Sequence, residues 1–183
     1  LADYGAEVIK IERPDGGDPA RAMGPFWHDE PGLETSGLFL HLNTNKQSVT
    51  LNLKSQDGKA ILKELVKDAD ILVENFKPGV MDRLGLSYDV LSAINPGLVM
   101  TSISNFGQTG PYRDYKMTEI VLYAMGGTMQ STGTSDREPV KLALTAEQFF
   151  CGGVSATATM GAHLGALVDG EGQHLDRSEE HTS

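Results

Sequence analysis

Polar and aromatic side chains follow a short apolar run near the middle of the sequence. Residues 71–74, Ile-Leu-Val-Glu, are typical of a buried strand, and Asn75, Phe76, Lys77 and Arg83 come after it. In open α/β sheets, ligands bind in the crevice beyond the carboxyl ends of the strands. An amide, an aromatic face and cations suit a nucleotide that carries phosphates. We therefore predict a ligand site at this strand end.

A second cation stands at the end of another apolar run. Arg13 follows the predicted strand 8–11 and precedes a turn rich in Gly and Pro. A guanidinium with backbone amides nearby suits a phosphate group. A surface ion pair with Glu12 or Asp15 is the alternative that the spacing leaves open.

An acidic residue, Glu147, stands where a helix of small residues is predicted to begin. The segment from there to Leu167 is rich in Gly and Ala. The macrodipole and the unpaired amides of a helix start favour a carboxylate. Many helices carry an acid there for stability alone, so the pattern leaves open a catalytic and a structural role.

These residues need strands and helices that bring them together. Apolar runs alternate with amphipathic segments along the chain, which predicts an α/β fold with a mostly parallel sheet. The order of strand, helix and strand between residues 48 and 74 predicts a parallel pair joined by a crossover helix. Residues 18–37 are predicted to be an irregular loop. The expected strands are 8–11, 48–53, 71–74 and 98–104, and the expected helices are 56–68, 80–84, 88–94, 118–126 and 147–167.

The composition narrows the class of protein. The 183 residues hold 15 Lys and Arg against 25 Asp and Glu, a formal net charge of −10 that argues against nucleic-acid binding. The single cysteine, Cys151, fits a reducing compartment, so we expect a cytoplasmic protein in which this thiol is buried packing. No apolar run has the length of a membrane span. No His or Cys stands at metal spacing from His28, so we expect no metal site.

The last residues of the chain differ from the segment before them. Residues 177–183 show no periodicity and do not continue the preceding pattern, so we set them aside as a non-native tail. Residues 1–176 are expected to form part of a larger domain.

Four ordered motifs resemble the class III CoA-transferases, the family of formyl-CoA and carnitine CoA-transferases. They are KIERP at 10–14, LNxxKxSxxLNL at 42–53, ADILVENFKPGVMDRLG at 69–85 and INPGLVMTSISNFGQTGPY at 94–112. The resemblance implies a Rossmann-like large domain, incomplete here, from a protein that forms interlocked homodimers. It also implies that apolar faces of this chain are exposed.

The resemblance further implies which residues contact CoA, which is a substrate and not a permanently bound cofactor. Transferred position by position, the CoA contacts fall on Arg13, Asn75, Phe76, Arg83 and Lys116. The family often has Tyr two residues after that lysine, whereas this chain has Thr118.

In the family, an Asp commonly preceded by Gly is the nucleophile at the start of the small-residue helix. The matching place here is Ala146-Glu147, and Gln148 is a neighbour that could position the acid. The resemblance implies that this carboxylate attacks an acyl-CoA thioester and passes CoA to a second carboxylic acid. The additional methylene of Glu moves the nucleophile by more than about one ångström, enough to lose much of the orientation advantage unless the pocket is built for it.

Two alternatives remain beside the transferase. Related racemases of the same fold move the α-proton of an acyl-CoA with a His and an Asp, whereas this chain has Thr118 and Glu147 at those places. Lacking the histidine base, an acyl-CoA isomerase or racemase is disfavoured. The other alternative is a CoA-binding pseudoenzyme in which Glu147 only caps its helix.

Overall fold

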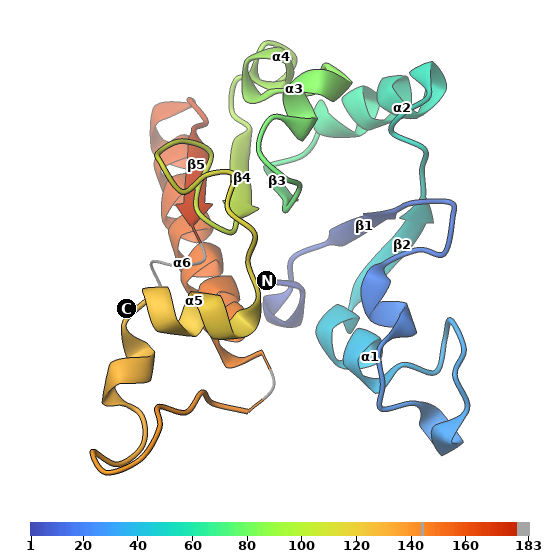
Figure 1. Ribbon diagram of the computed structural model, residues 1–183. Helices are drawn as coiled ribbons and strands as arrows, with labels where there is room; N and C mark the ends of the chain where they lie inside the picture. The colour runs from blue at the N-terminus through green and yellow to red at the C-terminus, as the bar shows by residue number, and fades with distance from the viewer. Residues whose placement is uncertain (144, 179–183) are drawn as a thin grey trace. The chain divides into compact units, whose positions relative to one another are not determined.

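The computed structural model describes residues 1–143 and 145–178, and the chain divides into two compact units, Leu1–Leu62 and Lys63–Ser183. Figure 1 shows the helices and strands of both units. The first contains η1 (Ala2–Tyr4), β1 (Val8–Glu12), η2 (Pro19–Ala22), η3 (Trp27–Asp29), α1 (Gly37–Asn43), β2 (Lys46–Thr50) and most of α2 (Gln56–Val66). The second contains β3 (Ile71–Glu74), α3 (Val80–Leu84), α4 (Tyr88–Ser92), β4 (Val99–Ser104), α5 (Glu119–Met125), η4 (Thr128–Ser131), α6 (Ala146–Asp169) and β5 (His174–Ser178).

A parallel pair of strands forms the sheet of the first unit. β1 and β2 pair in register from Val8 opposite Lys46 to Glu12 opposite Thr50. α1 lies between them in the chain and begins at Ser36, whose hydroxyl accepts the N–H of Phe39. A serine at this position satisfies an amide that the helix start leaves without a partner.

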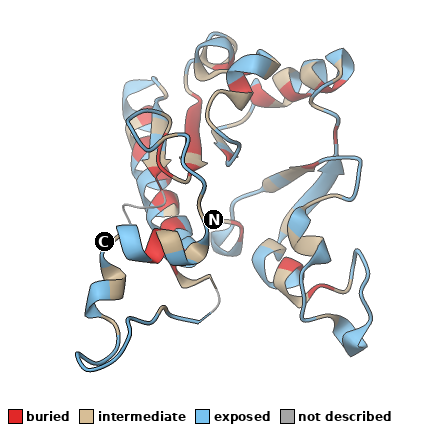
Figure 2. Ribbon diagram, viewed as in Figure 1, coloured by how far each residue is buried: buried red, intermediate tan, exposed pale blue. Residues whose placement is uncertain are grey.

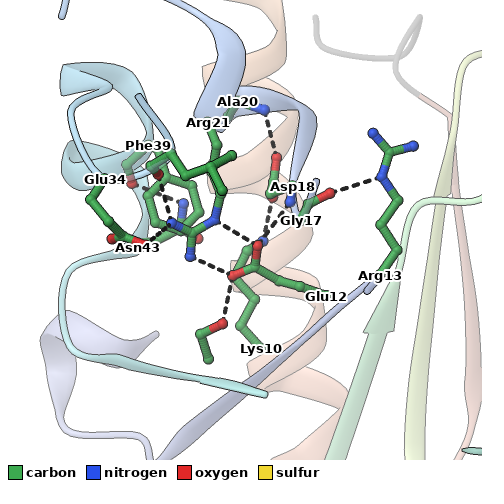
Figure 3. Close-up of polar contacts among 12 residues, drawn as sticks. Lys10, Glu12, Arg13, Gly17, Asp18, Ala20, Arg21, Glu34, Phe39 and Asn43 are labelled. Carbon is green, nitrogen blue, oxygen red and sulfur yellow. Dashed lines mark hydrogen bonds and ion pairs between the residues drawn. The ribbon is translucent and has the colours of Figure 1, made fainter. Parts of the chain in front are cut away.

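A buried ion pair joins β1 to the irregular segment that follows it (Figure 3). Glu12 is 5% exposed and accepts two hydrogen bonds from the guanidinium of Arg21, at 2.8 and 2.9 Å. Ser48 on β2 donates to the same carboxylate, and the guanidinium lies 3.7 Å from the ring centre of Phe39. This cluster fastens the segment 18–37, which is irregular as predicted apart from two short 3-10 turns.

Three parallel strands form the sheet of the second unit, with β4 in the centre between β3 and β5. α6 packs against one face of β4, where Val99 contacts Ala162 and Ala166. On the same face, the hydroxyls of Thr101 and Thr159 lie 2.8 Å apart. Figure 2 shows buried residues concentrated on β4 and along α6. Small residues allow the helix to approach the strand closely.

The predicted α/β class with parallel strands is confirmed, and each predicted strand and helix is present, β3 and α3 with the predicted bounds and the others with shifted ends. The predicted pairing across residues 48–74 is wrong, because β2 pairs with β1 and β3 pairs with β4 in a separate sheet. The order of strand, helix and strand constrains direction but leaves open which edge a strand joins. α1 was missed because its leucines and phenylalanine do not follow a long helical period.

β5 was also missed, and it extends two residues beyond the boundary drawn at residue 176. Arg177 and Ser178 pair with Ile103 and Ser104 of β4. Strand pairing uses backbone groups, so it needs no side-chain periodicity. Residues 179–183 of the expected tail lie outside the described residues.

Several apolar side chains of the second unit are exposed, as expected. Leu164 is 60% exposed, Leu167 67% and Val168 84%, all near the end of α6. Among the described residues, no helix is both long and apolar enough to cross a membrane.

We expect Arg21→Met to destabilise the full-length protein by about 3 kcal/mol, because it leaves the Glu12 carboxylate buried without its partner. Urea unfolding measures the loss. Arg13→Met is the matched control, since this exposed arginine is the next residue after Glu12 and its Nε donates only to the Gly17 carbonyl, at 2.9 Å. Equal unfolding midpoints for the two variants would contradict the central role of the ion pair.

The same cluster predicts a pH dependence of stability. Hydrogen bonds from Arg21 lower the pKa of Glu12 from 4.5 to about 2, although burial opposes this shift. Stability from this group is complete above its unfolded pKa and is lost as the pH falls from 4.5 towards 2. The difference in unfolding free energy between wild type and Glu12→Gln should therefore shrink by about 3 kcal/mol over that range. A difference that stays constant with pH would refute this assignment.

Candidate functional site

A row of polar side chains lies on the face of the second sheet opposite α6. Glu74, Ser102 and Asp176 are aligned across β3, β4 and β5. The Ser102 hydroxyl lies 2.9 Å from Nε2 of His174, the first residue of β5. The ring of Tyr88 from α4 stacks on this imidazole with centroids 5.3 Å apart. One face of the sheet therefore packs against a helix, and polar side chains lie on the other face.

Glu74 fixes the chain where it leaves β3. Its side chain accepts the N–H of Phe76 at 2.7 Å. Burial raises the pKa of Glu74, and a hydrogen bond from Ser102 offsets part of this shift. The turn leaves Asn75 exposed and the Phe76 ring 40% exposed. Both predicted CoA contacts are therefore accessible at the carboxyl end of a parallel strand.

A cavity of about 170 Å³ lies beside this turn. Asn75, Phe76 and Arg83 are not among its lining residues, whereas Lys77 and Gly79, which lie between them in the chain, are. Its lining consists of Glu74, Lys77, Gly79, Met81, Asp82, Ser87, Tyr88, Met100, Ser102, Gln108, Arg113 and His174. The sequence predicted the turn but not the contributions of Arg113 and His174, because both come from segments far from it in the chain.

The remaining predicted cations occupy different elements. Arg83 lies in the last turn of α3, and Lys116 lies just before α5. Both are exposed, and within residues 1–143 and 145–178 neither forms an ion pair. Arg13 belongs to the first unit and is exposed. The carboxylate of its neighbour Glu12 accepts a hydrogen bond from Arg21 and not from Arg13. The alternative of a surface pair between Arg13 and Glu12 is thus wrong.

Glu147 lies in the first turn of α6 and is 3% exposed. Its backbone N–H donates to Oε1 of Glu119, in the first turn of α5, at 3.1 Å. The carboxylate of Glu119 therefore lies at the start of α6, where it accepts the backbone N–H of Glu147. Glu119 was missed in the sequence, because only tertiary packing brings it to this helix start. Gln148, the next residue, is exposed.

The structure also shows the surroundings of Cys151 and His28, two further residues considered in the sequence. Cys151 is 2% exposed, with its sulfur 3.8 Å from the hydroxyl of Ser155, as predicted for buried packing. His28 is exposed. Within the described residues, no group of three His, Cys, Asp or Glu side chains is arranged to hold a metal ion.

Comparison with known proteins identifies the family. The family model described as CoA-transferase family III matches residues 1–182. Succinate–glutarate CoA-transferase of Agrobacterium fabrum is 41% identical over 178 residues, which cover 96% of this chain and 44% of that protein. Acetyl-CoA:oxalate CoA-transferase of Acetobacter aceti is 43% identical over 179 residues, 97% of this chain and 45% of that protein.

A solved structure of a CAIB/BAIF family protein from Brucella suis has the same fold. Its TM-score is 0.90 at 37% identity, and the match covers 100% of this chain and 48% of that one. The chain thus spans less than half the length of these relatives. A match that runs along almost every residue, at both the sequence and the structural level, shows that the chain belongs to CoA-transferase family III.

Proposed function

We propose that this chain is part of an enzyme that moves CoA from an acyl-CoA to a carboxylic acid. The observation that carries the proposal is the match of the family III model to residues 1–182. The relatives named for CoA transfer to oxalate, and between succinate and glutarate, agree with a carboxylic acid as the acceptor.

In this proposal, CoA binds at the end of β3. Exposed Asn75 and Phe76 offer an amide and a ring to the nucleotide. Arg83 and Lys116, which form no ion pair within residues 1–143 and 145–178, offer charge to its phosphates. Arg13, which belongs to the first unit, remains a CoA contact predicted from the family resemblance. A cation without an ion pair keeps its full charge for an incoming anion, which supports this assignment.

Glu147 is proposed as the carboxylate that carries the acyl group and then CoA. Its oxygen attacks the thioester carbon, the C–S bond breaks, and CoA leaves as a thiolate from an enzyme-bound anhydride. The thiolate attacks the glutamyl carbonyl, which releases the first acid and forms a glutamyl thioester. The acceptor carboxylate attacks this thioester, and the returning thiolate takes the new acyl group from the second anhydride and restores Glu147.

The burial of Glu147 sets a requirement on this mechanism. At 3% exposure, the carboxylate is reached by a thioester only if the start of α6 opens in the acyl-CoA complex. The same observation favours a second candidate, a CoA-binding pseudoenzyme in which Glu147 serves the structure of its helix. The two candidates differ in whether a covalent intermediate forms.

Incubation of the full-length protein with acetyl-CoA, followed by hydroxylamine and peptide mass analysis, should yield a hydroxamate on Glu147, since hydroxylamine attacks both the anhydride and the thioester. Glu147→Gln should yield none. Glu138→Gln, the same substitution at an exposed acid in the polar loop before α6, is the matched control and should retain the adduct. An adduct that persists in Glu147→Gln would remove this residue as the nucleophile, and tight binding of intact acetyl-CoA without any adduct would favour the pseudoenzyme.

The contact between α5 and α6 generates a separate prediction. Glu119→Ala should speed hydrogen exchange at the Glu147 amide and destabilise the protein by about 1 kcal/mol, because the helix start loses its acceptor. Glu138→Ala, an exposed acid in the following polar loop, is the control. Unchanged exchange at residue 147 in Glu119→Ala would show that the contact does not hold the helix start in place.

A further inference from the structure

A chain of polar side chains runs from a buried carboxylate to an exposed imidazole. Glu74 is 8% exposed and Ser102 is 2% exposed, whereas His174 is exposed. Glu74 and Ser102 are register partners on β3 and β4, and the Ser102 hydroxyl donates to this carboxylate. The same hydroxyl oxygen lies 2.9 Å from Nε2 of His174 on β5. Two buried groups are therefore connected to solvent through one imidazole.

The carboxylate of Glu74 also holds the turn that follows β3. Its Oε2 accepts the N–H of Phe76 at 2.7 Å. An ionised carboxylate only accepts hydrogen bonds, and a serine hydroxyl has one proton to donate. Because Ser102 gives that proton to Glu74, its oxygen must accept a proton from His174. The ionised state of Glu74 therefore requires the tautomer of His174 that carries its proton on Nε2.

Protonation of Glu74 reverses these hydrogen bonds. The Phe76 amide keeps its acceptor oxygen, so the new proton lies on the other oxygen and is donated to Ser102. The Ser102 hydroxyl then donates to Nε2 of His174, whose own proton is on Nδ1. Hydrogen bonds to a charged acceptor are about twice as strong as those to a neutral one. Protonation thus weakens the bond that holds the Phe76 amide.

The groups around Glu74 set the pH at which this change occurs. Burial raises the pKa of Glu74 from its ordinary value of 4.5, and hydrogen bonds from Ser102 and the Phe76 amide offset part of this shift. From β5, the charge of His174 lowers this pKa and the charge of Asp176 raises it. Further titratable residues that line the same cavity are Lys77, Asp82, Tyr88 and Arg113.

Two further elements bring side chains to this part of the unit. Tyr88 of α4 stacks on the His174 ring with centroids 5.3 Å apart. At Gly79, the residue before α3, a Cβ would lie 3.3 Å from Nη1 of Arg83 and 3.4 Å from Nη2 of Arg113. Stacking covers a face of the imidazole, whereas its N–H bonds lie in the plane of the ring. The stacked tyrosine therefore leaves proton exchange at the ring nitrogens possible.

We propose that Glu74, Ser102 and His174 form a proton relay that sets how firmly the turn after β3 is held. A proton from solvent binds Nδ1 of His174, the proton on Nε2 passes to Ser102, and the hydroxyl proton of Ser102 passes to Glu74. One proton enters and one carboxylate is neutralised. Glu74 is thus a positioning residue for Asn75 and Phe76. The binding of CoA at this turn rests on the proposed function, whereas the relay does not.

The tautomer of His174 tests the relay without any ligand. Solid-state NMR of the full-length protein with isotope-labelled histidine nitrogens distinguishes the two tautomers, and His174→Gln identifies the signal. At about pH 8 the proton should lie on Nε2 in wild type and on Nδ1 in Glu74→Gln, because the glutamine amide donates to Ser102 as the protonated acid does. Glu138→Gln, an exposed acid before α6, is the matched control and should keep the wild-type tautomer. The same tautomer in wild type and Glu74→Gln would overturn the relay.

Hydrogen exchange of the wild-type protein covers the case in which Glu74→Gln does not fold. After correction for the intrinsic effect of pH, protection of the Phe76 amide should fall as the pH is lowered from about 8 towards 4.5, because Glu74, with its raised pKa, becomes protonated. The Gly97 amide is the matched control, since it donates to the non-titrating side chain of Asn95, two residues earlier, at 3.1 Å. Equal changes in protection at the two amides would overturn the relay.

Isothermal titration of the full-length protein with CoA tests the positioning role. Glu74→Gln should weaken CoA binding by about threefold to tenfold at about pH 8, because a neutral acceptor holds the Phe76 amide less firmly. The wild-type affinity should approach that of Glu74→Gln as the pH falls, and this comparison cancels the titration of the CoA phosphates. Equal affinities of wild type and Glu74→Gln at every pH would overturn the positioning role. If the tautomer changes as expected but the wild type binds no CoA at any pH, the proposed function fails and the relay stands.

Discussion

The contact between α6 and the central strand β4 determines which face of the second sheet is covered and which face holds the polar side chains. Val99 packs on Ala162 and Ala166, and Thr101 bonds Thr159, so one face of the sheet is closed by a helix. Side chains alternate along a strand, and the next residues of β4 must therefore point the other way. This alternation places Ser102 beside Glu74 and His174 on the open face. The candidate site follows from a packing contact on the opposite side of the sheet.

The turn after β3 connects this sheet to the proposed function. Glu74 anchors the Phe76 amide, which leaves the ring and Asn75 accessible, and Gly79 leaves room between two guanidiniums. Within residues 1–143 and 145–178 neither guanidinium forms an ion pair, and like charges held close together raise the free energy of the unliganded state. A phosphate-bearing ligand would recover that energy on binding. A site that is electrostatically incomplete in the free protein is therefore consistent with an anionic substrate such as CoA.

In the first unit, the tertiary structure determines which arginine pairs with Glu12, a point that the sequence leaves open. Glu12 is the last residue of β1, and Arg13 follows it outside the strand. Glu12 is buried with Arg21, nine positions away, whereas Arg13 remains exposed (Figure 3). The loop that brings Arg21 to β1 has no periodic pattern, so its course could not be predicted. Among the described residues, Arg13 forms no ion pair.

The sequence by itself determined the α/β class, the strands and helices from β1 to α6 apart from α1, the exposure of the residues after β3 and the burial of Cys151. These features depend on local periodicity, turn residues and helix stops, which act over a few positions. Only the tertiary structure decided that β2 and β3 belong to separate sheets, that Glu119 meets the start of α6, and that Arg113 reaches Gly79. Each of these depends on contacts between segments far apart in the chain, and such contacts leave no regular spacing in the sequence.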